Sequence, residues 1–254
     1  MADARPTERF TIRVEDYERY RPDYPREVLT TLQGEHGLTP AHVIADIGSG
    51  TGLSARLFLE NGNVVYGVEP NEAMAAAAAR RFAGAAFHDV RGRAEATTLP
   101  DRSIDFIVAG QAFHWFDPTA AAAELRRILR PEGRLAVVWN RRRLDTTPFL
   151  LAYEELLQRW GTDYRQVSER YAEPGALATV FGGDGYRCHR FPHRQVFDRE
   201  GLRGRLLSSS YTPPPGHASH EPMLAALDAV FDACAVDGRV SFDYDTELYV
   251  GPLK

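Results

Sequence analysis

Short apolar segments alternate with helical patterns between residues 40 and 140, and this alternation constrains the fold more than any other feature. The apolar segments are rich in valine, isoleucine and aromatic residues, which predicts buried strands. They span 42–46, 63–69, 85–90, 104–110 and 134–139. Because strict alternation of strand and helix favours right-handed crossovers, we predict a doubly wound α/β fold with a parallel sheet in this region.

The segments between these strands carry recognisable helix ends. Helices are predicted over 53–61, 71–82 and 118–129. For the last of them, Asp117 and Pro118 supply the N-cap and the first helical residue. We expect "RPEG", at 130–133, to stop that helix.

The pattern changes after Asn140. An amphipathic helix with many aromatic residues is predicted over 146–167. Two later strands are predicted at 186–197 and 238–250, with helical segments near 199–209 and 221–235 between them. The last strand alternates apolar and polar residues, which is typical of an antiparallel strand near the edge of a mixed sheet.

The length of 254 residues suits one domain with an appended cap rather than two independent domains. We divide the chain into an N-terminal helical cap segment (1–40) and a cofactor-binding α/β core (41–140). A helical substrate-cap insert (141–185) follows. The last part (186–254) is expected to return antiparallel strands and connecting helices to the core.

Charge and cysteine content exclude several classes of protein. The formal net charge is -5, from 35 acidic and 30 basic residues, which disfavours a nucleic-acid or anionic-membrane binder. Cys188 and Cys234 are too few for a disulfide framework or a thiolate metal site. The charged N-terminus and the lack of a long apolar run predict a cytoplasmic protein without membrane contact.

A glycine-rich turn follows the first predicted strand. Gly48, Gly50 and Gly52 come directly after Asp46 in "DIGSGTG". Ligands of open α/β sheets bind near the first βα turn, where glycine lets a ligand lie on the backbone. Glu69 ends the second strand, where a carboxylate can accept two hydrogen bonds from a ribose diol. The sequence therefore predicts a ligand that contains a nucleoside.

The glycine spacing separates two classes of cofactor. A dinucleotide fingerprint, G-x-G-x-x-G, needs glycine at position 53, where this chain has Leu53. An NAD(P)-dependent oxidoreductase is therefore disfavoured, though it stays open as a third function. A tight turn without a ligand explains the glycines alone, but not the glycines together with Asp46 and Glu69.

Four motifs in order extend this pattern. They are "DIGSGTG", "VEPNEAM", "GRAEATTLPDRSIDFIVAGQAFHWFD" and "RILRPEGRLAVVWN". Over about residues 10–140 the chain resembles the class I S-adenosylmethionine-dependent methyltransferases, in the small-molecule (type 11-like) branch with H-W-F after the fourth strand. The resemblance implies a Rossmann-like fold with a seven-stranded mixed sheet that ends in an antiparallel hairpin. It also implies S-adenosylmethionine as cofactor and S-adenosylhomocysteine as product.

The resemblance implies roles for individual residues. The methionine and ribose part of the cofactor is expected against Asp46, Gly48, Ser49, Gly50 and Thr51, with Glu69 on the ribose hydroxyls. The adenine is expected near Pro70, Met74, Ala94 and Glu95. The sulfonium is expected near Gln111, Ala112, His114 and Trp115. Arg21 and Tyr20 are expected to close over the cofactor carboxylate, although a solvated helix end before a proline also explains their segment.

The segment after the fourth strand narrows the acceptor. It reads "GQAFHWF" and lacks the Asn/Asp-Pro-Pro-Tyr segment of amino-methylating nucleic-acid and glutamine enzymes. Neither cysteine follows a proline, as the nucleophile of pyrimidine C5 methylation does. We therefore expect a small-molecule substrate, methylated at an oxygen, carboxylate or carbon centre, and disfavour nucleic acid as a partner.

His114, at the carboxyl end of the fourth strand, is the candidate catalytic residue, either as a general base or as the residue that orients the acceptor. Methyl transfer is an in-line displacement, so positioning supplies much of the acceleration. A general base is needed only when the acceptor must lose a proton. A hydrogen-bonded wall residue beside Trp115 explains His114 equally well.

Other polar residues have open roles. The adjacent Arg141, Arg142 and Arg143 form a solvated turn, contact phosphate, or bind a carboxylate on a small substrate. No metal site is predicted, because strand alternation puts Cys188 on the opposite face from His189 and His193. His217 and His220 belong to a lid or to a plain surface loop.

The aromatic residues of the insert line a substrate pocket or form its core. They are Phe149, Tyr153, Trp160, Tyr164 and Tyr171. A methyltransferase is the favoured function, and a non-catalytic cofactor-binding module or sensor is the alternative. The sequence specifies neither the acceptor nor the oligomeric state.

Overall fold

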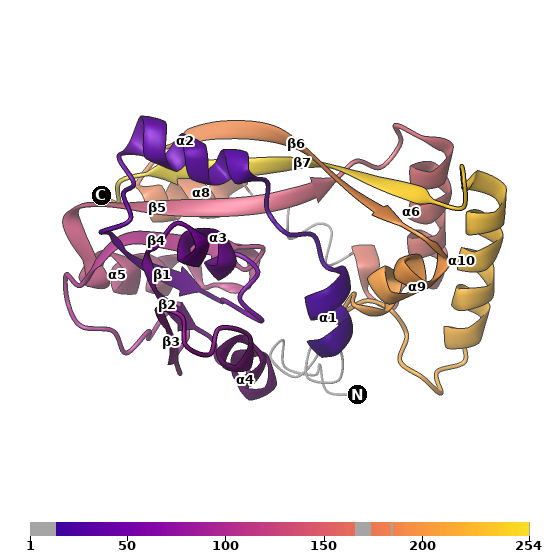
Figure 1. Ribbon diagram of the computed structural model, residues 1–254, viewed down its shortest axis with the longest axis horizontal. Coiled ribbons are helices and arrows are strands. Elements are labelled where there is room, and N and C mark those ends of the chain that lie inside the picture. Colours follow the sequence, from indigo (N-terminus) through magenta and orange to yellow (C-terminus); the bar gives the residue numbers. More distant parts are fainter. Residues whose placement is uncertain (1–13, 166–173, 184, 254) are drawn as a thin grey trace.

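A seven-stranded mixed sheet organises the computed structural model, which describes residues 14–165, 174–183 and 185–253 (Figure 1). The strands are β1 (Val43–Ile47), β2 (Val64–Val68), β3 (Phe87–Val90), β4 (Ile104–Gly110), β5 (Leu129–Arg142), β6 (Arg187–Phe197) and β7 (Val240–Gly251). Their order is β3-β2-β1-β4-β5-β7-β6. The first five strands are parallel, and β7 is antiparallel to both β5 and β6. The predicted doubly wound, seven-stranded sheet is confirmed.

The helices follow the expected alternation. They are α1 (Val14–Tyr20), α2 (Arg26–His36), α3 (Ala55–Glu60), α4 (Glu72–Arg81), α5 (Pro118–Ile128), α6 (Pro148–Trp160), α8 (Pro174–Phe181), α9 (Arg199–Leu207) and α10 (His220–Cys234). The predicted start of α5 is confirmed, because the Asp117 side chain accepts hydrogen bonds from the N–H groups of Thr119 and Ala120. No helix in the described ranges is long and apolar enough to cross a membrane.

Three sequence expectations were wrong in detail. "RPEG" does not separate α5 from a later strand, because β5 begins at Leu129 and a register shift against β4 accommodates these residues. The predicted helix 146–167 ends at Trp160, where Gly161 forms the C-cap; residues 166 and 167 lie outside the described ranges. β6 and β7 pair antiparallel but are not a hairpin, since α9 and α10 stand between them.

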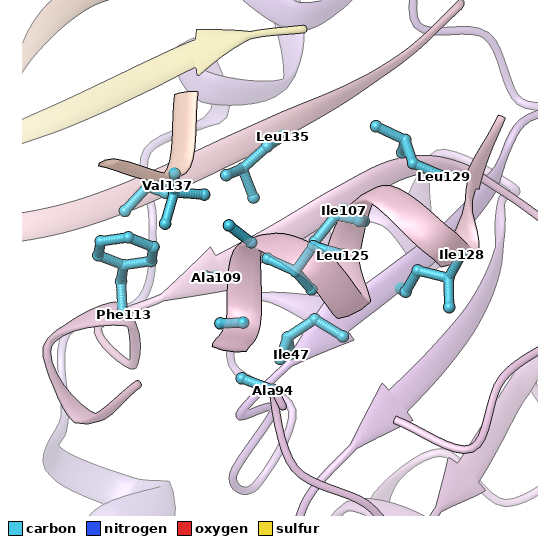
Figure 2. Packing of buried hydrophobic residues seen from close by; sticks show 14 of the residues in the cluster. Ile47, Ala94, Ile107, Ala109, Phe113, Leu125, Ile128, Leu129, Leu135 and Val137 are labelled. Atoms are coloured by element: carbon cyan, nitrogen blue, oxygen red, sulfur yellow. The ribbon is translucent and has the colours of Figure 1, made fainter. Parts of the chain in front are cut away.

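Two apolar clusters cover the two faces of the sheet, because alternate residues of each strand point to opposite sides. On one face, α5 and α8 pack over β1, β4 and β5; Figure 2 shows Leu125 and Ile128 of α5 close to Ile107 and Leu135. On the other face, α2 and α3 pack against residues such as Ile44 and Val108. These layers hold the carboxyl ends of β1, β2 and β4 together at one edge.

A third cluster forms at the far end of the long strands. There α6, α9 and α10 pack around Phe242 and Tyr244 of β7. We call these helices, with the adjoining ends of β6 and β7, the cap; Figure 1 shows it at the end of the ribbon opposite α5. Helix α1 contacts both α4 and α9 and so lies between the core and the cap (Figure 1).

The predicted insert 141–185 contributes one helix to the cap and another to the face of the sheet that α5 covers. Its first helix, α6, belongs to the cap, whereas Leu177, Val180 and Phe181 of α8 are buried against α5. Helices α9 and α10, from the predicted part 186–254, pack in the cap as well. The domain boundaries at 40, 140 and 185 stay a prediction.

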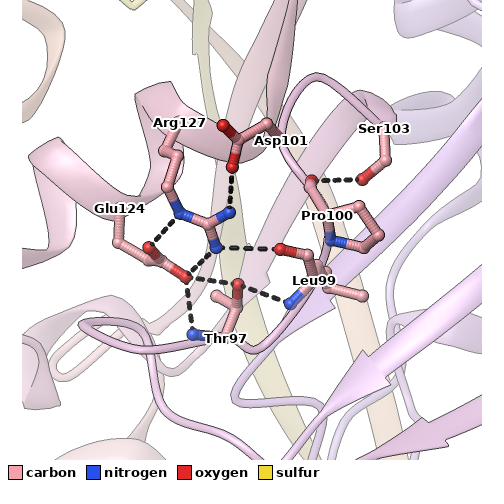
Figure 3. A network of polar contacts seen from close by, with 7 residues as sticks. All are labelled: Thr97, Leu99, Pro100, Asp101, Ser103, Glu124 and Arg127. Carbon is pink, nitrogen blue, oxygen red and sulfur yellow. Dashed lines mark hydrogen bonds and ion pairs between the residues drawn. The ribbon is translucent and has the colours of Figure 1, made fainter.

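A polar network fixes the loop between β3 and β4. The Glu124 carboxylate of α5 accepts hydrogen bonds from the Thr97 N–H at 2.7 Å and from Arg127, which also binds Asp101 (Figure 3). The hydrogen bond from Arg127 lowers the pKa of Glu124 to about 2, against the opposing effect of burial. The network holds the segment that carries Ala94 and Glu95.

Candidate active site

The glycine turn after β1 has a conformation that only glycine adopts easily. Gly48 and Gly50 have φ angles of 69° and 55°. A Cβ atom at Gly48 would lie 2.6 Å from the Cβ of Ala112, in the loop after β4. The Gly48 N–H donates to the carbonyl of Val68 at 2.8 Å, which ties the turn to β2. The turn therefore presents bare backbone at the carboxyl edge of the sheet.

Glu69 links this turn to the start of α4. Its buried carboxylate accepts hydrogen bonds from the N–H groups of Gly50 at 2.9 Å and Asn71 at 2.8 Å. Burial raises the pKa of Glu69, although these two hydrogen bonds and Arg91 oppose the rise. Each carboxylate oxygen keeps a free lone pair, which a ribose hydroxyl can use.

Asp46 is a second buried acid at the same edge. Its Oδ2 accepts a hydrogen bond from Ser54 at 2.7 Å, while its Oδ1 is buried and has no partner among the described residues. Burial, together with a smaller effect of the Glu69 charge, raises the pKa of Asp46 to about 7 against the opposing effect of the Ser54 hydrogen bond. The Oγ1 of Thr51 is also buried without a partner in the described chain. Neither Asp46 nor Glu69 forms a salt bridge with a described residue, so the two acids are suited to a positively charged ligand.

A cavity of about 270 Å³ starts at this turn and runs toward the cap. Gly48, Ser49 and Ser54 line its beginning, and Gly110 and Gln111 at the end of β4 continue it. The rest of its wall comes from Tyr17, Arg21, Pro22, Tyr24, Leu53, Trp139, Asn140, Arg141, Arg142, Leu144, Tyr164, Arg205, Tyr211 and Tyr244. Core, α1 and cap therefore enclose one space.

Four of the predicted site residues line this cavity, namely Arg21, Gly48, Ser49 and Gln111. Gln111 is one of the few described non-glycine residues with positive φ, at 55°. Its Oε1 accepts a hydrogen bond from the Asn140 N–H at 2.8 Å. The carboxyl ends of β4 and β5 are thereby joined at the cavity wall.

Other predicted residues surround the turn without lining the cavity. Thr51, Met74, Ala94 and Ala112 are buried, whereas Pro70 is exposed. Glu95 accepts a hydrogen bond from the Asp117 N–H at 2.9 Å. The rings of His114 and Trp115, in the short 3-10 helix η3 (Phe113–Trp115), have centroids 4.7 Å apart and are tilted by 45°. The cavity lining thus covers only part of the predicted set.

The structure places Tyr17, not Tyr20, on the cavity. The Tyr20 ring packs so closely on α9 that a Cβ at Gly204 would lie 2.0 Å from it. Tyr17, almost one helical turn earlier, lines the cavity. Burial raises the pKa of Tyr17, which interacts electrostatically with Arg21 and Arg205 and with Glu69 and Asp46. Tyr17 therefore lies between the acidic edge of the sheet and the basic wall of the cap.

The cap wall contains the residues that sequence analysis missed. Arg205 of α9 is 6% exposed and donates to Ser209 Oγ at 3.1 Å and, at 3.5 Å, to the Tyr244 hydroxyl. Nothing in "REGLRGRLL" distinguishes this arginine from the exposed Arg203. Arg205 lines the cavity because of the way α9 packs in the cap.

The arginine triplet after the fifth strand separates into three environments. Arg141 pairs with Glu247, Arg142 pairs with Glu154 at 2.5 Å, and Arg143 pairs with Asp245 at 2.7 Å. Arg141 and Arg142 end β5 and line the cavity. The triplet is therefore not a solvated turn.

Histidines outside the cavity have structural partners. The predicted alternation in β6 is confirmed, with Cys188 exposed and His189 and His193 half-buried. His189 lies 3.3 Å from His36 and near Glu35, a grouping that the sequence did not predict. His220 bonds the Pro213 carbonyl at 2.7 Å, and the N–H of Ser219 donates to His217.

The aromatic residues of the insert form the interior of the cap. Phe149 and Tyr153 are buried there, and Trp160 packs against the same cluster. Tyr164 belongs to this cluster and also lines the cavity. Tyr171 lies outside the described residues. Both alternatives for these residues are therefore met in part.

Several known proteins are similar to this chain in sequence or in fold. The family model described as "Methyltransferase domain" matches residues 45–137. An uncharacterized methyltransferase-like protein of Schizosaccharomyces pombe is 30% identical over 236 residues, which cover 91% of this chain and 88% of that protein. An uncharacterized methyltransferase of the same organism is 31% identical, with 87% and 86% covered.

The chain belongs to the class I S-adenosylmethionine-dependent methyltransferases. A solved methyltransferase from Geobacter sulfurreducens, in complex with S-adenosylhomocysteine, has the same fold. It superposes with a TM-score of 0.54 at 18% identity, covering 96% of this chain and 98% of that one. S-adenosylmethionine is the cofactor of the chain described here. The glycine turn and the unpartnered oxygen of Asp46 fit it.

Proposed function

We propose that this methyltransferase is an active enzyme that transfers a methyl group to a small-molecule acceptor at an oxygen, carboxylate or carbon centre. The supporting observation is the cavity, which starts at the glycine turn and ends against the cap. A space of about 270 Å³ suits a small molecule rather than a polymer. The acceptor is expected between the turn and the cap wall.

Several residues of this chain would hold the cofactor. Glu69 would accept hydrogen bonds from the ribose hydroxyls, and Asp46 Oδ1 would face the methionine ammonium. Arg21 would bind the cofactor carboxylate, since its Nε is buried without a partner in the described chain. Tyr17 replaces Tyr20 beside it. The remaining predicted residues keep their proposed places, namely Gly48, Ser49, Gly50, Thr51, Pro70, Met74, Ala94, Glu95, Gln111, Ala112 and Trp115.

The chemistry requires little beyond positioning. The bound sulfonium supplies a methyl carbon that is already activated for displacement. The chain's own residues hold the acceptor in line and exclude water, for which well-oriented reactions gain roughly 7–11 kcal/mol. Gln111, held by its bond to Asn140, lines the path between the two ends of the cavity.

We propose that His114 packs beside the site and does not transfer a proton. Its ring contacts Trp115 at a tilt of 45°, and it is not among the described residues that line the cavity. His114→Ala should therefore retain turnover within about threefold, measured once an acceptor is known. A loss of about a hundredfold or more would identify it as the general base after all.

Calorimetry and label transfer test this function. Titrations with S-adenosylmethionine, S-adenosylhomocysteine and NAD should show binding of the first two. A panel of metabolites with methyl-labelled cofactor should then yield a labelled product. Cofactor binding without transfer to any acceptor would favour a sensor or partner subunit, and binding of NAD alone would contradict the proposal.

A further inference from the structure

Arg205 is a buried cation that has no anionic partner among the described residues. Two hydrogen bonds connect it to neutral hydroxyls, those of Ser209 and Tyr244. No carboxylate of the described chain lies within ion-pair distance of its guanidinium, in contrast to the exposed Arg203, which pairs with Asp228. Burying an arginine in this way is costly, and a guanidinium carries five N–H donors. Since Arg205 lines the cavity, a ligand there can reach it.

Arg142 offers a second donor at the same wall. Its Nη2 binds Glu154 and the Tyr164 hydroxyl, at 2.5 Å and 3.0 Å. Its Nη1 is buried and has no partner among the described residues. Glu154 therefore neutralises Arg142 and leaves one of its nitrogens available.

The positive charges of the nearby arginines affect the pKa of the Tyr211 hydroxyl. Burial alone would raise the pKa of Tyr211, but the charges of Arg205, Arg21 and Arg142 outweigh burial and hold that pKa below its ordinary value. Tyr211 and Tyr244 both line the cavity. Phenol hydroxyls are good donors to an anion.

We propose that the methyl acceptor carries a carboxylate, which Arg205 and Arg142 bind at the cap end of the cavity. The inference rests on the proposed function and names the substrate class of the same site. Arg205 would supply the charge and Arg142 a further N–H. The Tyr211 hydroxyl would donate a further hydrogen bond to the carboxylate, whereas the Tyr244 hydroxyl already donates to Gln195 Oε1 at 3.0 Å.

The charge count favours a carboxylate over a phosphate. Glu154 compensates Arg142, and Glu247 pairs with Arg141 and also with the exposed Arg190, which is not among the described residues of the cavity wall. The cofactor carboxylate would compensate Arg21. One uncompensated cation, Arg205, is left among the described arginines of the wall, and it matches a single negative charge. A phosphate monoester brings between one and two charges near neutral pH.

The test uses the smallest carboxylate, so that it does not depend on the shape of the true acceptor. Acetate is titrated at constant ionic strength into ¹⁵N-labelled protein saturated with S-adenosylhomocysteine, and the arginine side-chain signals are followed by NMR. Acetamide, a neutral analogue of similar size, and inorganic phosphate are titrated in parallel. We expect acetate to shift the Arg205 signal with saturation, and acetamide to leave it in place.

Substitutions locate the binding. Arg205→Gln should weaken acetate binding by at least about tenfold, because a hydrogen-bonded charge is removed. Arg203→Gln is the matched control on the same helix and should leave acetate binding unchanged. Arg205→Lys keeps the charge without the planar fork and should bind acetate with intermediate affinity.

Three results would contradict a carboxylate site at Arg205. A non-saturating acetate titration, an equal response to acetamide, or saturation by phosphate alone would overturn the inference. The wild-type titrations decide it even if Arg205→Gln does not fold. S-adenosylhomocysteine binding, measured on the same samples, separates the two proposals: its absence removes the proposed function, whereas its presence without acetate binding removes only the carboxylate.

Discussion

The two ends of the cavity differ in charge and in how the chain builds them. At the end near the sheet, Asp46 and Glu69 are buried acids with raised pKa values. At the cap end, Arg142 and Arg205 provide buried cations beside Tyr211. A cationic sulfonium donor and an anionic acceptor would each meet the opposite charge. We call these the donor end and the acceptor end.

Asp46 and Glu69 of the donor end belong to one continuous stretch of sequence. They lie close together because the carboxyl ends of adjacent parallel strands meet at one edge of the sheet. The acceptor end needs β5, α9 and the segment after α9 to meet through the antiparallel ribbon. Local sequence motifs therefore predict the donor end. The acceptor end depends on how the helices of the cap pack.

The largest expected effect comes from filling the glycine turn at the donor end. Gly48→Ala forces a left-handed conformation, at about 1–2 kcal/mol, and a contact with Ala112, at about 1–3 kcal/mol. Urea unfolding should show this loss in the free energy of unfolding, and S-adenosylhomocysteine binding should be lost. Gly34→Ala, in helix α2 with no atom near the new Cβ, is the control and should be no less stable than the wild type.

Glu69→Gln should weaken cofactor binding without disturbing the acceptor end. The variant loses a charged acceptor, so calorimetry should show an S-adenosylhomocysteine affinity about tenfold lower or worse. Glu72→Gln, on the exposed first turn of α4, should change nothing. An unchanged affinity in Glu69→Gln would remove Glu69 from the cofactor site.

Asp46 makes the stability of the cofactor-free protein depend on pH. Burial raises the pKa of its carboxyl from 3.8 to about 7, so the folded chain keeps a proton that the unfolded chain loses. The free energy of unfolding should therefore fall as the pH rises from about 4 to 7, by up to about 1.4 kcal/mol per unit. Asp46→Asn should lack this fall, whereas the exposed Asp145→Asn should retain it. Urea unfolding across this range measures both.

The smallest effect concerns Tyr211 at the acceptor end. Because arginine charges lower its pKa against the effect of burial, one tyrosine should ionise below pH 10 in the free protein. Ultraviolet difference absorbance should lose this step in Tyr211→Phe and keep it in Tyr249→Phe, since burial and Glu247 raise the pKa of Tyr249. Persistence of the step in Tyr211→Phe would assign it to another residue.

Sequence reasoning was accurate where local signals determine structure. β4 spans the predicted residues, and α5 begins at Asp117 and Pro118, because an apolar strand and a capped helix start leave clear patterns. The start of β5 was misplaced, at 134 instead of Leu129, because Gly133 and its neighbours belong to the strand rather than to a turn. A close approach explains the glycine, since a Cβ there would lie 2.6 Å from the Leu129 side chain.

The site divides in the same way. Asp46, Gly48 and Glu69 were predicted because their spacing along one stretch is typical of a nucleoside site. Arg205 was not, because its importance comes from contacts with β7 and with the segment after α9. Tyr20 and Tyr17 lie on one short helix, and only the packing against Gly204 decides which faces the cavity.

A crossed measurement tests the separation of donor end and acceptor end most directly. Affinities for S-adenosylhomocysteine, by calorimetry, and for acetate, by NMR of the cofactor-saturated protein, are determined for Glu69→Gln and Arg205→Gln. The account predicts that Glu69→Gln weakens only the first and Arg205→Gln only the second, each by about tenfold or more. Equal weakening of both ligands by either substitution would contradict it.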